Sequence, residues 1–157
     1  MSHLPRHLFF YGTLVAGSSN PVAAAIHAAL EPIGLASAAG ILHAIPDPAG
    51  WFPALVLNDG PVAARVSGAL YRASAGFDAE LLARMDAYED FDPADLAGSL
   101  YRRITIMVRT EGDDDVAAAT YVWNRALPPG AERVGGGHFA GWLAETGNRV
   151  FGATRSA

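Results

Sequence analysis

Glu89 is a candidate for acid–base chemistry because of its place on a predicted helix. Leu82, Met85 and Glu89 are spaced i, i+3 and i+7, so their side chains share one face of that helix. This is the apolar face, and burial there favours the neutral carboxyl group and raises its pKa. The negative end of the helix dipole and the charges of Asp86 and Asp90 act in the same direction. Such an acid can accept and return a proton near neutral pH. In the alternative interpretation, Glu89 lies at a frayed helix end and reaches solvent.

A second candidate is the turn Tyr11-Gly12-Thr13-Leu14, which follows the short apolar run at 8–10. A strand that ends in glycine lets the backbone turn with its N–H groups exposed, and successive free N–H groups form an anion-binding concavity. Gly12 also lacks the Cβ that would keep a ligand away from the backbone. The turn is therefore a candidate binding site for a carboxylate, or it is an ordinary glycine turn at a strand end.

The third candidate is Tyr101-Arg102-Arg103, at the start of a strongly alternating segment. Arg102 shares a strand face with Ile104 and Ile106, and an inward arginine can orient an acidic substrate. The alternatives are that it lies at the rim of the sheet or pairs with a nearby acid. Tyr101 either offers its hydroxyl to a pocket as a substrate-binding group or packs in the core.

Composition excludes several other classes of function. The chain has 157 residues and no cysteine, so disulfides, thiolate nucleophiles and cysteine-ligated metals are ruled out. The five histidines show no metal-binding spacing. The net charge is −5, and the 11 basic residues, all arginine, form no runs. We therefore expect neither nucleic acid nor a membrane surface as a partner. Because Gly12 interrupts the apolar stretch at 8–16, we read it as a strand rather than a signal peptide and predict a soluble cytoplasmic protein.

The elements that position these residues follow from apolar periodicity and from turn and capping signals. A helix is predicted from Pro21, with Asn20 as its N-cap, to the residues before Pro32. Further helices are predicted from Asp78 to Tyr88 or Glu89 and over 138–145, with Gly147 after the last one. The predicted strands cover 8–11, 33–45 as one long bent strand, 54–57, 62–71, 101–110 and 116–123, with a loop over 46–53 and turns at 58–60 and 111–115.

Most predicted strands follow one another, which does not fit a doubly wound βαβα fold. We predict an α+β protein, a small mostly antiparallel β-barrel or sheet with flanking helices. No long linker divides the chain, so we expect one domain over 1–157.

Ordered motifs over about 120 residues give the chain a resemblance to the γ-glutamylcyclotransferase-like family, also called AIG2-like. The matching segments are Phe9-Phe10-Tyr11-Gly12-Thr13-Leu14 with Asn20 beyond it, Phe52-Pro53-Ala54-Leu55, Val66-Ser67-Gly68-Ala69-Leu70-Tyr71, Met85-Asp86-Ala87-Tyr88-Glu89, Tyr101-Arg102-Arg103 and Tyr121-Val122-Trp123. They resemble the family's Y-G-[ST]-L loop, its P-A-L and V-x-G-x-[LV]-[YF] strands, its L-D-x-[YF]-E segment, its Y-x-R strand and its late strand.

The resemblance implies a small β-barrel fold and a reaction in which a γ-glutamyl substrate cyclises to 5-oxoproline and releases an amine, amino acid or peptide. It implies no cofactor and no metal. The family's catalytic glutamate falls on Glu89, and its carboxylate-binding loop falls on Tyr11, Gly12, Thr13 and Leu14.

This chain differs from the family at several positions. No base follows the loop at 15–19, the segment 90–100 is long and acidic, and Met85 stands where the family usually has leucine. These differences do not identify the leaving group. Two other interpretations stay open: a non-catalytic small-molecule-binding domain of the same fold, and a purely structural or interaction domain.

Overall fold

The computed structural model describes residues 4–12, 21–48, 50–57 and 64–148. In this part of the chain the helices are α1 (Pro21–Ala28), α2 (Ala79–Tyr88) and α3 (Phe139–Thr146), with a 3-10 turn at Leu96–Gly98. The strands are β1 (His7–Phe10), β2 (Leu30–Ala39), β3 (Ile41–Asp47), β4 (Gly50–Val56), β5 (Arg65–Ala73), β6 (Tyr101–Thr110), β7 (Asp115–Trp123) and β8 (Glu132–Arg133).

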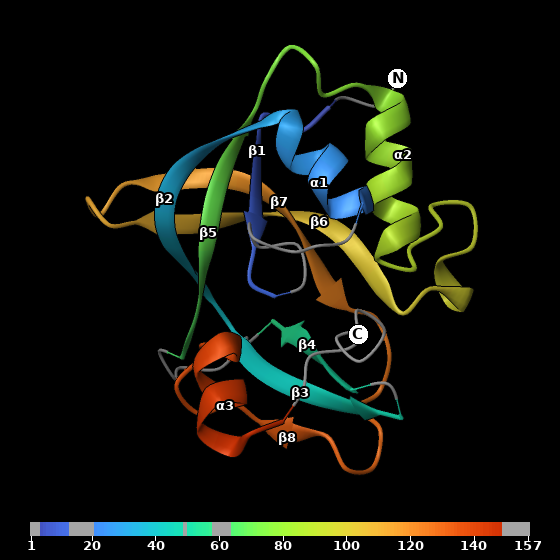
Figure 1. The fold of residues 1–157 in the computed structure, drawn as a ribbon, viewed down its shortest axis with the longest axis vertical. Coiled ribbons are helices and arrows are strands. Elements are labelled where there is room, and N and C mark those ends of the chain that lie inside the picture. The colour runs from blue at the N-terminus through green and yellow to red at the C-terminus, as the bar shows by residue number, and fades with distance from the viewer. Residues whose placement is uncertain (1–3, 13–20, 49, 58–63, 149–157) are drawn as a thin grey trace.

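Five of these strands close into a barrel in the order β1-β5-β2-β6-β7, and β4-β3-β8 form a second sheet beside it (Figure 1). All but one of the strand pairings are antiparallel. The exception is a parallel contact between β1 and β7, where Leu8 pairs with Ala119 and closes the barrel. The predicted α+β fold, a mostly antiparallel small barrel with flanking helices, is confirmed.

The prediction of one long bent strand over 33–45 is wrong, because the chain changes sheets at Gly40. The strand β2 begins at Leu30, which we had placed in the first helix, and ends at Ala39, and β3 leaves the barrel to join the second sheet. A Cβ on Gly40 would lie 2.6 Å from Leu55 Cδ1 and 2.9 Å from Val56 O. Only glycine therefore lets the backbone pass this close to β4.

The predicted loop over 46–53 is also wrong in its second half. Strand β4 already begins at Gly50 and includes Pro53, which pairs with Ala44 of β3. Proline is tolerated here because β4 is the edge strand of the second sheet and needs no backbone donor on its outer side. The predicted turn at 58–60 lies outside the described residues.

Two clusters of buried side chains make up the core. One fills the barrel and includes Phe9, Leu55, Val66, Leu70, Val108 and Val122. The other lies between the barrel wall and the helices α1 and α2, and includes Leu8, Phe10, Ile26, Met85, Tyr101 and Tyr121. Both faces of β1 are buried as a result, because its alternating side chains enter one cluster and then the other. Where the helices cover the barrel, its outer wall is core as well.

The helices are held by conventional caps. The Asp78 carboxylate accepts the Leu81 N–H at 2.8 Å and starts α2, as the sequence predicted. Gly147 ends α3 in the left-handed conformation, at φ 72°. The α3 side chain of Trp142 packs edge-on against Trp51 of β4, with ring centroids 5.1 Å apart. No helix in the described ranges is long and apolar enough to cross a membrane.

Candidate functional site

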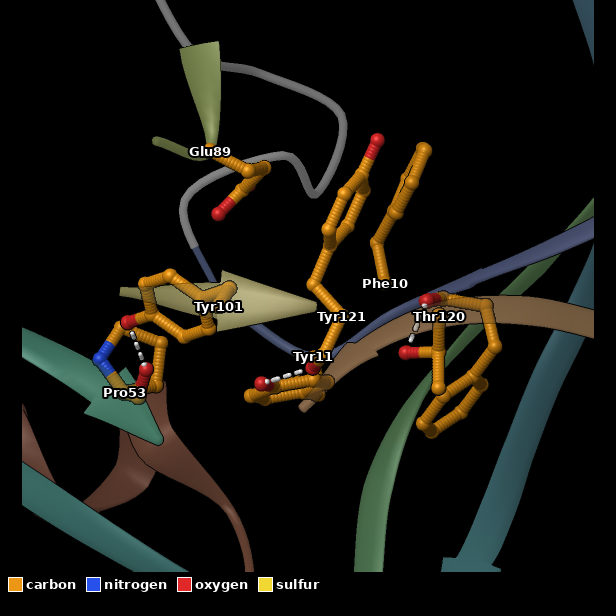
Figure 2. Close-up of a pocket in the computed structure, with 9 residues that line it drawn as sticks. Phe10, Tyr11, Pro53, Glu89, Tyr101, Thr120 and Tyr121 are labelled. Atoms are coloured by element: carbon orange, nitrogen blue, oxygen red, sulfur yellow. Dashed lines mark hydrogen bonds between the residues drawn. The ribbon is translucent and has the colours of Figure 1, made fainter. Parts of the chain in front are cut away.

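Helix α2 carries Glu89 to the end of the barrel. Its buried side chains Leu81, Leu82 and Met85 pack against the barrel wall, and the helix ends at Glu89, whose backbone N–H donates to Met85 O at 3.1 Å. Asp90 then takes a positive φ of 52° and turns the chain away. The apolar stripe therefore fixes the face on which the last residue of the helix points, and the Glu89 side chain extends into a pocket (Figure 2).

Residues from both sheets and from α2 line this pocket. They are Phe9, Phe10, Tyr11, Gly12, Pro53, Glu89, Tyr101, Thr120 and Tyr121. The enclosed volume is about 20 Å³, which is room for about one water molecule. The site is therefore a narrow recess walled mainly by aromatic rings, with a single carboxyl group entering it.

The Glu89 carboxyl group is in an unusual electrostatic environment. Burial raises its pKa from 4.5 to about 8, because a low-dielectric surrounding disfavours the charged form. No hydrogen bond or ion pair reaches this carboxyl group from the residues that the structure describes. Because no donor stabilises its carboxylate form, Glu89 holds a proton more strongly than an ordinary glutamate.

The tyrosine hydroxyls at the pocket donate their protons elsewhere. Tyr11 donates to the Tyr121 carbonyl oxygen and accepts the Leu55 N–H at 3.2 Å, and Tyr101 donates to the Pro53 carbonyl oxygen. Burial raises the pKa of both phenols above the usual value, so both stay protonated. Figure 2 shows these two bonds to backbone carbonyl oxygens, from Tyr11 to Tyr121 and from Tyr101 to Pro53, as dashed lines.

A third phenol belongs to an ionic network behind the pocket. Tyr121 donates to Asp86 Oδ1 at 2.6 Å, and Arg103 donates to the same carboxylate through Nε at 2.9 Å and Nη2 at 3.2 Å. Asp86 is only 4% exposed, and all these contacts meet its two oxygens. A bidentate interaction between a planar guanidinium and a carboxylate is strong and geometrically specific. The network joins α2 to β6 and β7.

The arginine that binds an acid at this end of β6 is Arg103. For Arg102 we had considered an inward position, because it shares a strand face with Ile104 and Ile106, or a place at the rim or in an ion pair. The structure instead turns Arg103 toward α2, on the same face of β6 as Tyr101, and pairs it with Asp86. The reason is that α2 covers the outer wall of the barrel at this end, so the outward face of β6 is also partly covered.

The structure brings four of the predicted site residues together, namely Tyr11, Gly12, Glu89 and Tyr101, all of which line the pocket. Thr13 and Leu14 lie outside the described residues. Sequence reasoning assigned no pocket role to Thr120 or Tyr121, which also line the pocket. The match of Tyr121 to a family motif was the available signal for that residue.

Gly12 has a steric reason for being glycine. A Cβ at this position would overlap with Cγ of Pro53. The residue therefore allows the backbone after β1 to pack directly against β4, which closes one wall of the pocket. Among the described residues, no three His, Asp or Glu side chains are grouped so that they could hold a metal ion.

The fold and site define a class of small β-barrel proteins in which a half-buried glutamate at the end of a helix enters a pocket beside the barrel. The sequence matches the family described as Gamma-glutamyl cyclotransferase, AIG2-like, over residues 8–152. The chain belongs to this family. None of the curated proteins matches it significantly.

Several solved structures share the fold. YkqA from Bacillus subtilis is 21% identical with a TM-score of 0.63, and the match covers 92% of this chain but only 43% of YkqA. An AIG2-like protein from Mus musculus is 24% identical with a TM-score of 0.56, covering 80% of this chain and 86% of the mouse protein. A gamma-glutamyl cyclotransferase is 14% identical with a TM-score of 0.52, covering 76% of this chain and 67% of that protein. This chain thus spans less than half of YkqA and most of the mouse protein.

Proposed function

We propose that this protein is a cyclotransferase that releases 5-oxoproline from a γ-glutamyl amino acid, amine or peptide, with Glu89 as general acid and base. The observation that carries the proposal is the Glu89 carboxyl group, which lies in the pocket with a pKa of about 8 and without a hydrogen-bond donor among the described residues. In this pocket the Glu89 carboxyl group lacks a hydrogen-bond donor, and the ammonium group of a glutamyl substrate carries several N–H donors. Family membership supports the same reaction.

The proposed reaction is intramolecular. Glu89 takes a proton from the substrate α-ammonium group, and the free amine attacks the γ-carbonyl carbon to form the new C–N bond. The old C–N bond breaks as Glu89 returns the proton to the leaving nitrogen. In the whole reaction the attacking nitrogen loses two protons and the leaving nitrogen gains two, so Glu89 carries each in turn. Holding both ends of the substrate together supplies the proximity that ring closure needs.

The state of Glu89 changes when substrate binds. In the free protein at pH 7, an acid with a pKa of about 8 is mostly protonated. A positive substrate ammonium beside it favours the carboxylate and lowers its pKa. Binding therefore prepares the base, and departure of the ammonium restores the acid. We place the substrate carboxylate at the backbone turn that begins at Tyr11 and Gly12, where backbone N–H groups can donate hydrogen bonds to it.

The test is an assay for 5-oxoproline across γ-glutamyl amino acids, amines and dipeptides. We expect Glu89→Gln to lose at least 100-fold in kcat/KM, as removal of a general acid–base group typically costs about 10²–10⁴-fold. Glu145→Gln, the same change at an exposed glutamate in the last turn of α3, is the matched control and should retain full activity. Turnover that survives in Glu89→Gln would exclude this role.

A second candidate function is a binding domain that keeps the pocket without turnover. The departures from the family pattern favour it, namely the segment 15–19 without a base and the long acidic segment 90–100. Saturable binding of γ-glutamyl compounds by calorimetry, together with no 5-oxoproline from any substrate in the panel, would establish this alternative.

A further inference from the structure

The end of α2 carries two carboxyl groups in different surroundings, Asp86, which is buried, and Glu89, which is half-buried. Asp86 receives a guanidinium and a phenol, whereas Glu89, three residues later on the same helix, receives neither. Residues three apart on a helix have side chains about 5–6 Å apart at Cβ. The donors bound to Asp86 therefore lie within one helical turn of the proposed base, yet they are bound to its neighbour.

We propose that Asp86, Arg103 and Tyr121 form a positioning network that withholds a cation and a hydroxyl donor from Glu89 and so keeps that carboxyl group free to accept a substrate proton. The proposal gives Asp86 a role distinct from that of Glu89: it touches no substrate atom and acts by fixing its neighbours. Its consequence for turnover rests on the proposed function, but its effect on Glu89 does not.

The titratable groups that line the pocket with Glu89 are Tyr11 after β1, Tyr101 of β6 and Tyr121 of β7. Asp86 and the exposed Asp90 are its neighbours along the chain at the end of α2, and Arg103 of β6 is held there by its ion pair with Asp86. The three phenols interact electrostatically with Glu89. Arg103 is thus the one cation in this described set with a fixed charge, and Asp86 binds it with both oxygens.

The hold on Arg103 is reinforced from its other side. Its guanidinium carbon lies 5.9 Å from the centre of the Phe91 ring, and the Tyr121 ring packs edge-on against the same Phe91 at 6.5 Å. The cation is thus held between a carboxylate and an aromatic face. With the acceptor at Asp86 neutralised, the Tyr121 hydroxyl would be released beside Glu89, with which it already interacts electrostatically, and Arg103 would lose its carboxylate partner.

Two substitutions should move the pKa of Glu89 in opposite directions. Asp86→Asn removes the competing anion and frees both donors, so the pKa of Glu89 should fall by about one unit. Arg103→Gln leaves Asp86 charged without its cation, and a nearby like charge should raise the pKa of Glu89 by about one unit. Arg103→Lys keeps the positive charge and should bring the pKa back toward the wild-type value.

The measurement is an NMR titration of the glutamate side-chain carboxyl carbons in the full chain, with the Glu89 signal assigned by its absence in Glu89→Gln. In active protein, the acidic limb of the pH profile of kcat/KM should shift together with the pKa of Glu89. A merely structural role for the network would lower activity in both variants without opposite shifts. Shifts of the same sign, or no shift in folded variants, would overturn the proposal.

Tyr121→Phe keeps the test decisive if the charge variants do not fold, because it removes a single oxygen. Since that hydroxyl donates to Asp86, its loss should leave the pKa of Glu89 nearly unchanged. A rise of about one unit would mean that the hydroxyl donates to Glu89 in solution, and would overturn the network.

Opposite shifts of the Glu89 pKa without any 5-oxoproline would support the network and refute the proposed function. If turnover depends on Glu89 but the two variants do not shift its pKa in opposite directions, the proposed function is supported and the network is refuted.

Discussion

Replacing Glu89 by glutamine should stabilise the protein while abolishing the proposed activity. The folded state raises the pKa of Glu89 from 4.5 to about 8, so the folded chain binds this proton more tightly than the unfolded chain. Below pH 4.5 both states are protonated and the group has no effect on stability. As the pH rises through the interval between the two values, the unfolded state loses the proton more easily, and folding is increasingly penalised. Above pH 8 the penalty is complete.

The size of this penalty follows from the same shift. Each pKa unit corresponds to about 1.36 kcal/mol, so the carboxyl group lowers the free energy of unfolding by about 3 kcal/mol at pH 7 and by about 4–5 kcal/mol above pH 8. At pH 5 the loss is below about 1 kcal/mol. Glutamine has nearly the same shape and no charge, so Glu89→Gln should remove the penalty without leaving a cavity.

The assay is urea unfolding at pH 5, 6, 7 and 8 for the wild-type protein, Glu89→Gln and the control Glu145→Gln. The difference between Glu89→Gln and wild type should be small at pH 5 and grow to several kcal/mol at pH 8, whereas Glu145→Gln should follow wild type throughout. Parallel stability profiles for wild type and Glu89→Gln would show that the Glu89 carboxyl group is ordinarily solvated. The reasoning about its role as a base would then fail.

Three further substitutions test how the pocket is built. Gly12→Ala should destabilise the fold by about 1–3 kcal/mol in urea unfolding, because its Cβ would overlap with the rigid ring of Pro53; an unchanged midpoint would contradict this packing. Tyr101→Phe should cost about 1–3 kcal/mol by leaving the buried Pro53 carbonyl oxygen without its donor, and a smaller loss would mean that water replaces the hydroxyl. Met85→Ala should cost about 2–5 kcal/mol, since the side chain is fully buried under α2; thermal unfolding measures it, and a negligible loss would show that α2 is loosely packed.

Much of the site could be predicted because its signals are local. The spacing of Leu82, Met85 and Glu89 defines one helix face, and that face packs against the barrel. Gly12 after an apolar strand marked a turn, and it lies in the pocket with Tyr11. The family motifs then joined segments that are far apart in the sequence.

The ionic network was not predictable from strand alternation. Alternation assigns one face of a strand to the core, but near Tyr101 both faces of β6 are at least partly buried, one by the barrel interior and the other by α2. The choice between Arg102 and Arg103 therefore depended on where α2 lies. The switch of sheets at Gly40 was missed for a similar reason, because only the approach of Leu55 shows why a side chain is excluded there.

The parallel contact between β1 and β7 has a consequence for how this chain matures. The Tyr11 hydroxyl donates to the carbonyl oxygen of Tyr121, which is 110 positions later in the sequence. Strand β1 acquires its second neighbouring strand only when Leu8 pairs with Ala119 of β7. During synthesis, the apolar segment around Phe9 and Phe10 leaves the ribosome long before β7, the strand that completes its pairing. Contacts this distant in sequence form slowly and expose the nascent chain to aggregation. The recess at the barrel's end is therefore among the last parts of the molecule to assemble, and a shortened chain that lacks β7 would have no recess at all.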